Sequence, residues 1–184
     1  MTLAAVVLAG GAGTRFEGDT HKLQTIVRGR PLVVWAIEHA REAGLDETVV
    51  VTGATPVPDV VGVTVVHNDR WAEGQATSLQ AAVRHAEHAG HEAIVVGVGD
   101  QPGVPSDAWR VVAATTTAPI VVATYDGERR SPVRLAKEIW PLLPRDGDEG
   151  ARVLMRGRPD LVSEVACSGD PADVDTLEDL KRWS

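Results

Sequence analysis

The sequence predicts an α/β domain with a mostly parallel central sheet and helices on both faces. Short runs of β-branched residues alternate with longer alanine-rich segments, which is the order that βαβ units produce. The short runs are apolar almost throughout, as is typical of strands that are covered on both faces. Prolines and glycines stand where the alanine-rich segments begin and end, and these residues favour helix starts and helix ends respectively.

Each element follows from a local pattern, taken in chain order. The first strand is the run LAAVVLA, and the helix after it is bounded by Pro31 and Gly44. The second long helix ends before Gly90, and the third begins after Pro105. The expected strands span residues 3–9, 48–52, 63–66, 93–98 and 120–124. The expected long helices span residues 32–43, 77–89 and 107–115.

The last third of the chain has a less regular pattern. Residues 125–160 are rich in proline, glycine and charged residues, with short helices expected around 136–143 and 149–156. A strand at 161–166 and a final helix at 176–183 are expected after them.

Composition narrows the function classes. No segment resembles a linker, so residues 1–184 are expected to form one domain. The 18 basic and 26 acidic residues give a net charge of −8, which argues against nucleic acid or an anionic membrane as a partner. Cys167 is the only cysteine, which favours a cytoplasmic protein without an intrachain disulfide. The first residues lack the basic and long apolar regions of a signal peptide or membrane span.

A glycine-rich stretch follows the first predicted strand. Gly10, Gly11 and Gly13 stand beyond its carboxyl end, where open α/β sheets bind ligands, and Arg15 and Lys22 come next. Bare backbone amides and two cations would suit the phosphates of a nucleotide. The stretch lacks the Gly-Lys pair of a Walker A loop and the third glycine of a dinucleotide fingerprint. A plain flexible turn is the alternative interpretation.

An aspartate follows another predicted strand. Asp100, in GDQP, comes after the run at 93–98 and should face the same edge of the sheet as the glycines. Mg²⁺ favours one or two carboxylates, with water and substrate phosphates completing its shell. Asp100 is therefore a candidate magnesium ligand, and a turn-forming aspartate is the alternative.

Taken together, LAGGAGTRF, Lys22-Leu23 and GRPLVVWAIE resemble the N-terminal signature of the MobA-like nucleotidyltransferases. The resemblance implies a Rossmann-like nucleotidyltransferase domain that moves a nucleoside monophosphate from an NTP to a phosphorylated acceptor. It also implies that Arg15, Lys22 and Asp100 are catalytic, with the two cations on phosphates. Phe16 and Glu17 depart from the Met and Gly that are usual in the family.

Two further segments resemble nucleotide-side elements of the same family. NDRWAEGQATSLQAAV, residues 68–83, resembles its N-x-x-W-x-x-G-M-x-S-S-L element, with Gln75 in place of Met and Thr77 at a Ser position, and a capped amphipathic helix is the alternative. GDEGAR, residues 147–152, matches an element found mainly in the molybdopterin cytidylyltransferase branch. The implied nucleotide-binding residues are Leu8, Ala9, Gly10, Gly11, Ala12, Gly13, Thr14, Arg15, Lys22, Asn68, Gly74, Thr77, Ser78 and Asp100.

The acceptor side and the second metal ligand come from later segments. GERRSPVRL, residues 127–135, resembles the family's acceptor-side element, with Arg130 where Gly is usual; this arginine either grips the acceptor phosphate or faces solvent. ADVDTLEDLKRW, residues 172–183, resembles DIDTPEDL. The second metal ligand is then Asp175, with Asp173 as a neighbouring candidate, and helix capping is the alternative role.

The resemblance implies transfer of CMP from CTP to the terminal phosphate of molybdopterin, with Mg²⁺ on Asp100 and Asp175 and release of pyrophosphate. GDQP, GDEGAR and DVDT favour CTP, whereas LAGG resembles the guanylyltransferase branch that uses GTP. Sugar-phosphate or alditol-phosphate acceptors share the fold. A non-catalytic nucleotide-binding protein that delivers cofactor is the alternative of another class, and a molybdenum hydroxylase is a candidate protein partner.

Overall fold

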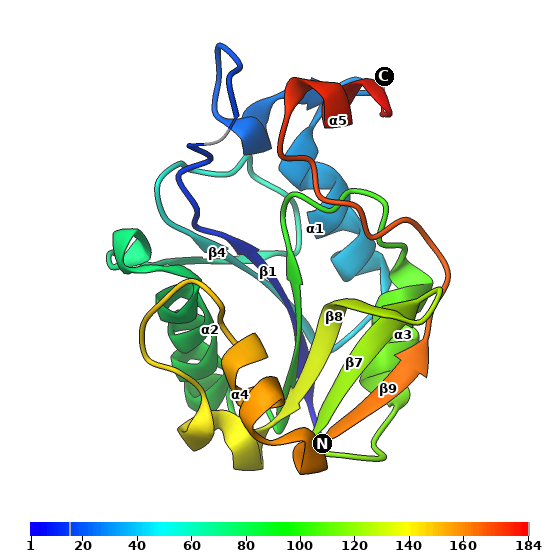
Figure 1. Cartoon of the computed structure of the whole chain (residues 1–184). Helices are drawn as coiled ribbons and strands as arrows, with labels where there is room; N and C mark the ends of the chain where they lie inside the picture. The colour runs from blue at the N-terminus through cyan, green and yellow to red at the C-terminus, as the bar shows by residue number, and fades with distance from the viewer. Residues whose placement is uncertain (15, 184) are drawn as a thin grey trace.

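The computed structural model describes residues 1–14 and 16–183, and its centre is a seven-stranded sheet (Figure 1). The strand order is β5-β4-β1-β6-β8-β7-β9, and every pairing is parallel except the two that β8 makes. The strands are β1 (Leu3–Ala9), β4 (Glu47–Thr52), β5 (Thr64–His67), β6 (Ala93–Val98), β7 (Ile120–Tyr125), β8 (Glu128–Ala136) and β9 (Val162–Ala166). The predicted α/β fold with a mostly parallel sheet is confirmed.

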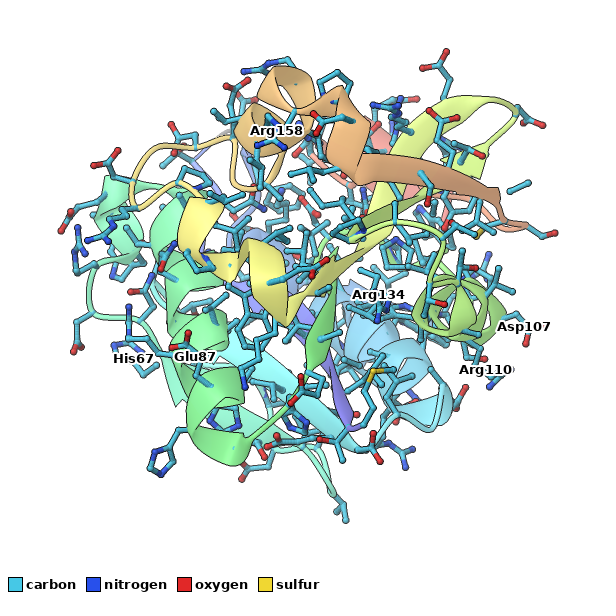
Figure 2. All side chains as sticks on the ribbon, turned by 90° about the horizontal axis from the view of Figure 1, so that it is seen from below. His67, Glu87, Asp107, Arg110, Arg134 and Arg158 are labelled. Atoms are coloured by element: carbon cyan, nitrogen blue, oxygen red, sulfur yellow. The ribbon has the colours of Figure 1, made fainter. Side chains whose placement is uncertain are left out.

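Helices cover both faces of the sheet. On one face lie α1 (Leu32–Glu42) and α3 (Ser106–Ala114), and on the other α2 (Gln75–Ala89) and α4 (Arg152–Gly157). Strand β1 is buried on both sides, because alternate residues of its apolar run enter the two opposite cores. Figure 2 shows α2 and α3 on opposite sides of the sheet.

Strand β8 is absent from the expected elements. It forms an antiparallel hairpin with β7 through Asp126 and Gly127, whose φ angles of 50° and 84° are those of a tight two-residue turn. The run ERRSPVRLA lacks the continuous apolar character of the other central strands. The Asp-Gly pair was the local sequence pattern that indicated a hairpin here. Strand β8 lies between β6 and β7 because it pairs with both of them.

The short elements predicted for the last third of the chain lie close to the observed ones. The helix expected at 136–143 is the 3₁₀ helix η3 (Lys137–Leu142), and the strand expected at 161–166 is β9. The helix expected at 149–156 begins later, as α4, and the final helix is α5 (Leu177–Lys181). The remaining short elements are η1 (Lys22–Gln24), β2 (Ile26–Val27), β3 (Arg30–Pro31), η2 (Trp71–Glu73) and η4 (Pro159–Leu161).

The C-terminal segment crosses to the end of the sheet where β1 and β6 finish (Figure 1). The N–H of Val174 donates to the carbonyl of Asp100 at 2.9 Å, and Val174 is fully buried beside Val27 and Leu32. This anchor brings residues 173–175 to the carboxyl end of β6. Within the described residues, no helix has the length and apolar character needed to cross a membrane.

Candidate active site

A cavity of about 480 Å³ lies beyond the carboxyl ends of β1 and β6. The glycine loop forms one wall, and the start of α2 with the loop before it forms another. The lining residues are Leu8, Ala9, Gly10, Gly11, Ala12, Gly13, Thr14, His21, Lys22, Leu23, Trp71, Ala72, Gly74, Gln75, Ser78, Val98, Gly99, Asp100 and Asp148. We call this space the loop cavity.

Close packing explains why the loop is made of glycine. A Cβ at Gly10 would lie 2.7 Å from the Oγ of Ser78, and one at Gly53 would lie 2.6 Å from the Gly10 carbonyl. Gly13 has φ of +65°, in the left-handed region that favours glycine. The interpretation as a plain flexible turn does not account for this packing. Gly53, which follows β4, is a loop partner that the sequence interpretation missed.

Lys22 lies between two aspartates that come from distant parts of the chain. Its Nζ donates to Asp100 Oδ2 at 2.8 Å and to Asp175 Oδ1 at 3.0 Å. The Lys22 side chain is only 12% exposed, and those of Asp100 and Asp175 are 20% and 34% exposed. The two carboxylates therefore face one another across a single cation.

Burial and charge act in opposite directions on this cluster. Burial lowers the pKa of Lys22, but Asp100 and Asp175 together raise it above its ordinary value, which keeps the ammonium charged. Burial raises the pKa of Asp100, Lys22 opposes that effect, and the nearby charges of Asp173 and Asp175 add to it, so the net pKa is raised. The Lys22 ammonium thus offsets part of the repulsion between the neighbouring carboxylates.

This donor set fits a divalent cation such as Mg²⁺. Two carboxylate oxygens already converge on one positive group, and Mg²⁺ commonly takes one or two carboxylates plus water and phosphate oxygens. No group of three or more His, Cys, Asp or Glu side chains suited to a metal occurs in the part of the chain that the structure describes. An ion here would rely on substrate oxygens for the rest of its shell.

The structure separates Asp173 from Asp175. Asp173 accepts from Gln101 Nε2 at 2.8 Å, whereas Asp175 accepts from Lys22. Helix capping is also present beside Asp175, because Thr176 and Asp179 form a reciprocal capping box at the start of α5. The backbone N–H of Asp175 donates to Asp179 Oδ2 at 3.0 Å, which leaves the Asp175 carboxylate available for the site.

Asn68, Thr77 and Ser78 form a buried network rather than a common cavity wall. The Asn68 side-chain amide donates to the Thr77 and Ser78 hydroxyls at 2.9 and 3.0 Å. Only Ser78 of the three lines either of the two cavities described here. The Thr77 hydroxyl in turn donates to the backbone carbonyls of Arg70 and Gly74, at 2.9 and 2.8 Å, in the segment before α2. Arg15, predicted to contact phosphate, lies outside the described residues.

The GDEGAR segment packs against the start of α2. A Cβ at Gly74 would lie 2.4 Å from the carbonyl of Gly147, and that carbonyl accepts from the N–H of Ala76 at 2.9 Å. This contact places Asp148 on the walls of both cavities. Asp148, Trp71 and His21 line the loop cavity without having been singled out as site residues from sequence.

A second cavity, of about 720 Å³, adjoins the first. Its floor includes the apolar side chains of Val96, Val122, Val133 and Leu135, and Asp100 lies in both cavities. Its lining residues also include Asp148, Asp173, Asp175, Arg129, Arg130, Arg152 and Arg156. We call it the arginine cavity.

Two of these arginines form close ion pairs within the described part of the chain, and two do not. Arg129 pairs with Glu164 at 2.6 Å, and Arg156 pairs with Glu149 at 2.5 Å. Among the described residues, Arg130 and Arg152 have no carboxylate within ion-pair distance. Arg130 donates only to the neighbouring backbone carbonyl of Arg129, at 2.9 Å. The arginine cavity therefore combines an apolar floor with both arginine and acidic side chains in its lining, and Glu149 is among the acidic ones.

Comparison with known proteins identifies the family. Residues 5–164 match the MobA-like NTP transferase domain. The chain is 31% identical to nicotine blue oxidoreductase of Paenarthrobacter nicotinovorans, over 98% of this chain and 95% of that protein. It is 33% identical to the molybdenum cofactor guanylyltransferase of Cereibacter sphaeroides, over 58% of this chain and 54% of that protein.

A solved structure shows the same fold along the whole chain. Rv0371c from Mycobacterium tuberculosis H37Rv has a TM-score of 0.84 and 26% identity, covering 99% of this chain and 97% of its own. A manganese complex of Rv0371c has a TM-score of 0.79 and 27% identity, covering 100% of this chain and 98% of its own. With its glycine loop and paired aspartates beyond the same edge of the sheet, this chain belongs to the MobA-like NTP transferase family.

Proposed function

We propose that the protein transfers CMP from CTP to the terminal phosphate of a molybdopterin-type acceptor and releases pyrophosphate. The observation that carries the proposal is the position of Asp100, with Lys22 and Asp175, where the loop cavity meets the arginine cavity. A nucleotide in the first cavity and an acceptor in the second would meet at this cluster.

The chain's own residues act by binding and orienting phosphates. The acceptor phosphate is ionised near neutral pH, so its attack on the α-phosphorus needs no general base. A bond forms between the acceptor oxygen and the α-phosphorus, and the bond to the departing pyrophosphate breaks. The glycine-loop amides, Arg15 and Lys22 would offset the charge on that leaving group. Mg²⁺, held by Asp100 and Asp175, would supply further charge neutralisation at the reacting phosphates.

The arginine cavity suits a phosphorylated acceptor with an apolar body. Valine and leucine side chains would contact the body, and Arg130 and Arg152 offer charge for an anionic group. The acceptor-side role of Arg130 is thereby favoured over a purely solvent-facing one. Sugar-phosphate and alditol-phosphate acceptors remain the alternatives, but their polar bodies would make fewer favourable contacts with the apolar floor.

A pyrophosphate-release assay tests the proposal. The protein is mixed with Mg²⁺, molybdopterin and either CTP or GTP, and release with CTP is expected to exceed release with GTP. Asp100→Ala should abolish release while its circular dichroism spectrum stays that of the unaltered protein. Asp107→Ala, on the outer face of α3 (Figure 2), is the matched control.

Each alternative predicts a different result from the same assay. Preferred release with GTP would assign guanylyl transfer, in line with the relative named as a guanylyltransferase. Nucleotide binding without pyrophosphate release from any acceptor would assign a non-catalytic, cofactor-delivering protein, for which a molybdenum hydroxylase is the expected partner.

The similarity to nicotine blue oxidoreductase supports a second candidate function, that of an oxidoreductase. The described residues argue against a dinucleotide site of the usual kind. The loop after β1 has no third glycine at the required position and leads to the three-residue 3₁₀ helix η1 rather than into an α-helix. Oxidation of NADH or NADPH in the presence of nicotine blue, without any nucleoside triphosphate, would favour the oxidoreductase.

A further inference from the structure

His21 makes hydrogen bonds from both edges of its ring, in the wall of the loop cavity. The backbone N–H of Leu23 donates to Nδ1 at 3.2 Å. On the other edge, Nε2 lies 3.0 Å from the carbonyl oxygen of Gly11. The ring thus connects the glycine loop to η1, the short helix that carries Lys22.

These contacts define where the imidazole proton lies. A backbone N–H can only donate, so Nδ1 is an acceptor and carries no proton. A carbonyl oxygen can only accept, so Nε2 carries the proton and donates it to Gly11. The neutral ring in this tautomer satisfies both contacts at once.

The ring packs closely against Gly13 of the loop. A Cβ at Gly13 would lie 3.3 Å from His21 Nε2 and 3.4 Å from the Cβ of Lys22. Gly13 also has the positive φ of +65° that glycine tolerates. The loop, the ring and the lysine therefore fit together as one packed unit.

We propose that His21 is a positioning residue that couples the glycine loop to Lys22. The inference rests on the proposed function, in which the loop amides and the Lys22 ammonium act on the same polyphosphate. The bond to Gly11 fixes the loop for nucleotide binding. The bond from Leu23 fixes η1, and with it the direction in which Lys22 reaches Asp100 and Asp175.

Two substitutions separate the two bonds. His21→Asn keeps an acceptor near the position of Nδ1 and loses the donor that reaches Gly11. His21→Gln keeps a donor near the position of Nε2 and loses the acceptor for Leu23. We expect the Asn variant to weaken nucleotide binding about three- to tenfold with kcat nearly unchanged. We expect the Gln variant to lower kcat by a similar factor, with nucleotide Kd nearly unchanged.

The measurements are the Kd for CTP and for GTP by calorimetry, kcat by pyrophosphate release, and hydrogen exchange of the loop amides without nucleotide. Exchange in residues 11–14 should accelerate in His21→Asn and not in His21→Gln. His21→Phe, which keeps the ring shape, should show both defects. His88→Asn and His88→Gln, at an exposed position near the end of α2, are the matched controls.

The outcomes separate this inference from the proposed function. If the unaltered protein binds no nucleoside triphosphate, both proposals are overturned. If the unaltered protein binds and transfers nucleotide, the inference is overturned when His21→Asn and His21→Gln have the same nucleotide Kd and kcat as the unaltered protein. The inference is also overturned if both variants change Kd to the same extent and kcat to the same extent. A purely structural role of His21 would give that result, because it would not affect Kd in one variant and kcat in the other.

Discussion

Replacing Lys22 by methionine should destabilise the protein far more than an ordinary surface substitution. Methionine keeps the length of the side chain and removes the ammonium that contacts Asp100 at 2.8 Å and Asp175 at 3.0 Å. Breaking a buried ion pair costs about 3–5 kcal/mol, because the partner charge stays buried without compensation. Asp175 is 34% exposed, so water screens part of the loss. We therefore expect about 3 kcal/mol.

Urea unfolding measures this loss. With a denaturant slope of about 2–3 kcal/mol/M, a loss of about 3 kcal/mol lowers the midpoint by roughly 1–1.5 M. The control is Lys137→Met, since the Lys137 ammonium lies 3.8 Å from Glu92 and both side chains are about half exposed. That change should cost less than about 1 kcal/mol.

A magnesium titration adds an independent readout to the same experiment. Without the ammonium, the two carboxylates need another cation, so Mg²⁺ should stabilise Lys22→Met more than it stabilises the unaltered protein. Activity should not return, because the phosphates still lack the lysine. A Lys22→Met protein as stable as Lys137→Met, or one that gains no more from Mg²⁺ than the unaltered protein does, would refute the reasoning.

Three further predictions concern Glu47, Gly13 and Arg134. Burial raises the pKa of Glu47, but its hydrogen bonds, of which the one with His91 has the largest effect, lower the pKa by more. The net pKa lies below the ordinary value. The ionised Glu47 carboxylate then contributes about 1–3 kcal/mol to the free energy of unfolding. This contribution is complete above about pH 4.3 and is lost as the pH falls through the lowered pKa. Urea midpoints for Glu47→Gln and unaltered protein should therefore differ at pH 7 and converge toward pH 3. Gly13→Ala should weaken CTP binding about tenfold in calorimetry, since the left-handed backbone costs about 1–2 kcal/mol, whereas Gly157→Ala should not. Arg134, labelled in Figure 2, is 4% exposed, and its Nε has no hydrogen-bond partner among the described residues. Arg134→Met should therefore stabilise the protein by about 1–3 kcal/mol in thermal unfolding, and an unchanged or lower midpoint would contradict this.

Continuous apolar runs made most of the sheet predictable. A strand such as β1 is buried on both faces, so each of its residues lies in an apolar environment. Such a strand can be recognised from its local sequence without knowing which strands pair with it. Strand β8 differs because its first residues, Glu128, Arg129 and Arg130, are exposed beside the arginine cavity. Its apolar residues come later, beyond a proline. Its identity as a strand depends on pairing with β6 and β7, which no local pattern contains.

The glycine loop and Asp100 were predictable for a geometric reason. The carboxyl ends of adjacent parallel strands lie at one edge of a sheet, so residues directly after β1 and β6 must be neighbours. The hydrogen bonds from Lys22 to both aspartates were not predictable. They depend on the path of a C-terminal segment 153 residues away from Lys22. His21 has no distinctive sequence signal either, since its role comes from contacts on both edges of its ring.

The two interpretations of the segment around Asp175 turn out to depend on each other. A helix as short as α5 has little stability of its own, so something else must hold it. The capping box of Thr176 and Asp179 orders its first turn, and the buried Val174 binds the backbone of Asp100. Asp175 lies between these two anchors, with its N–H bound by Asp179 and its carboxylate directed at Lys22. Capping is therefore the means by which a carboxylate from the end of the chain is delivered to the site, and loss of the Asp175 carboxylate alone would leave the Thr176–Asp179 capping box in place.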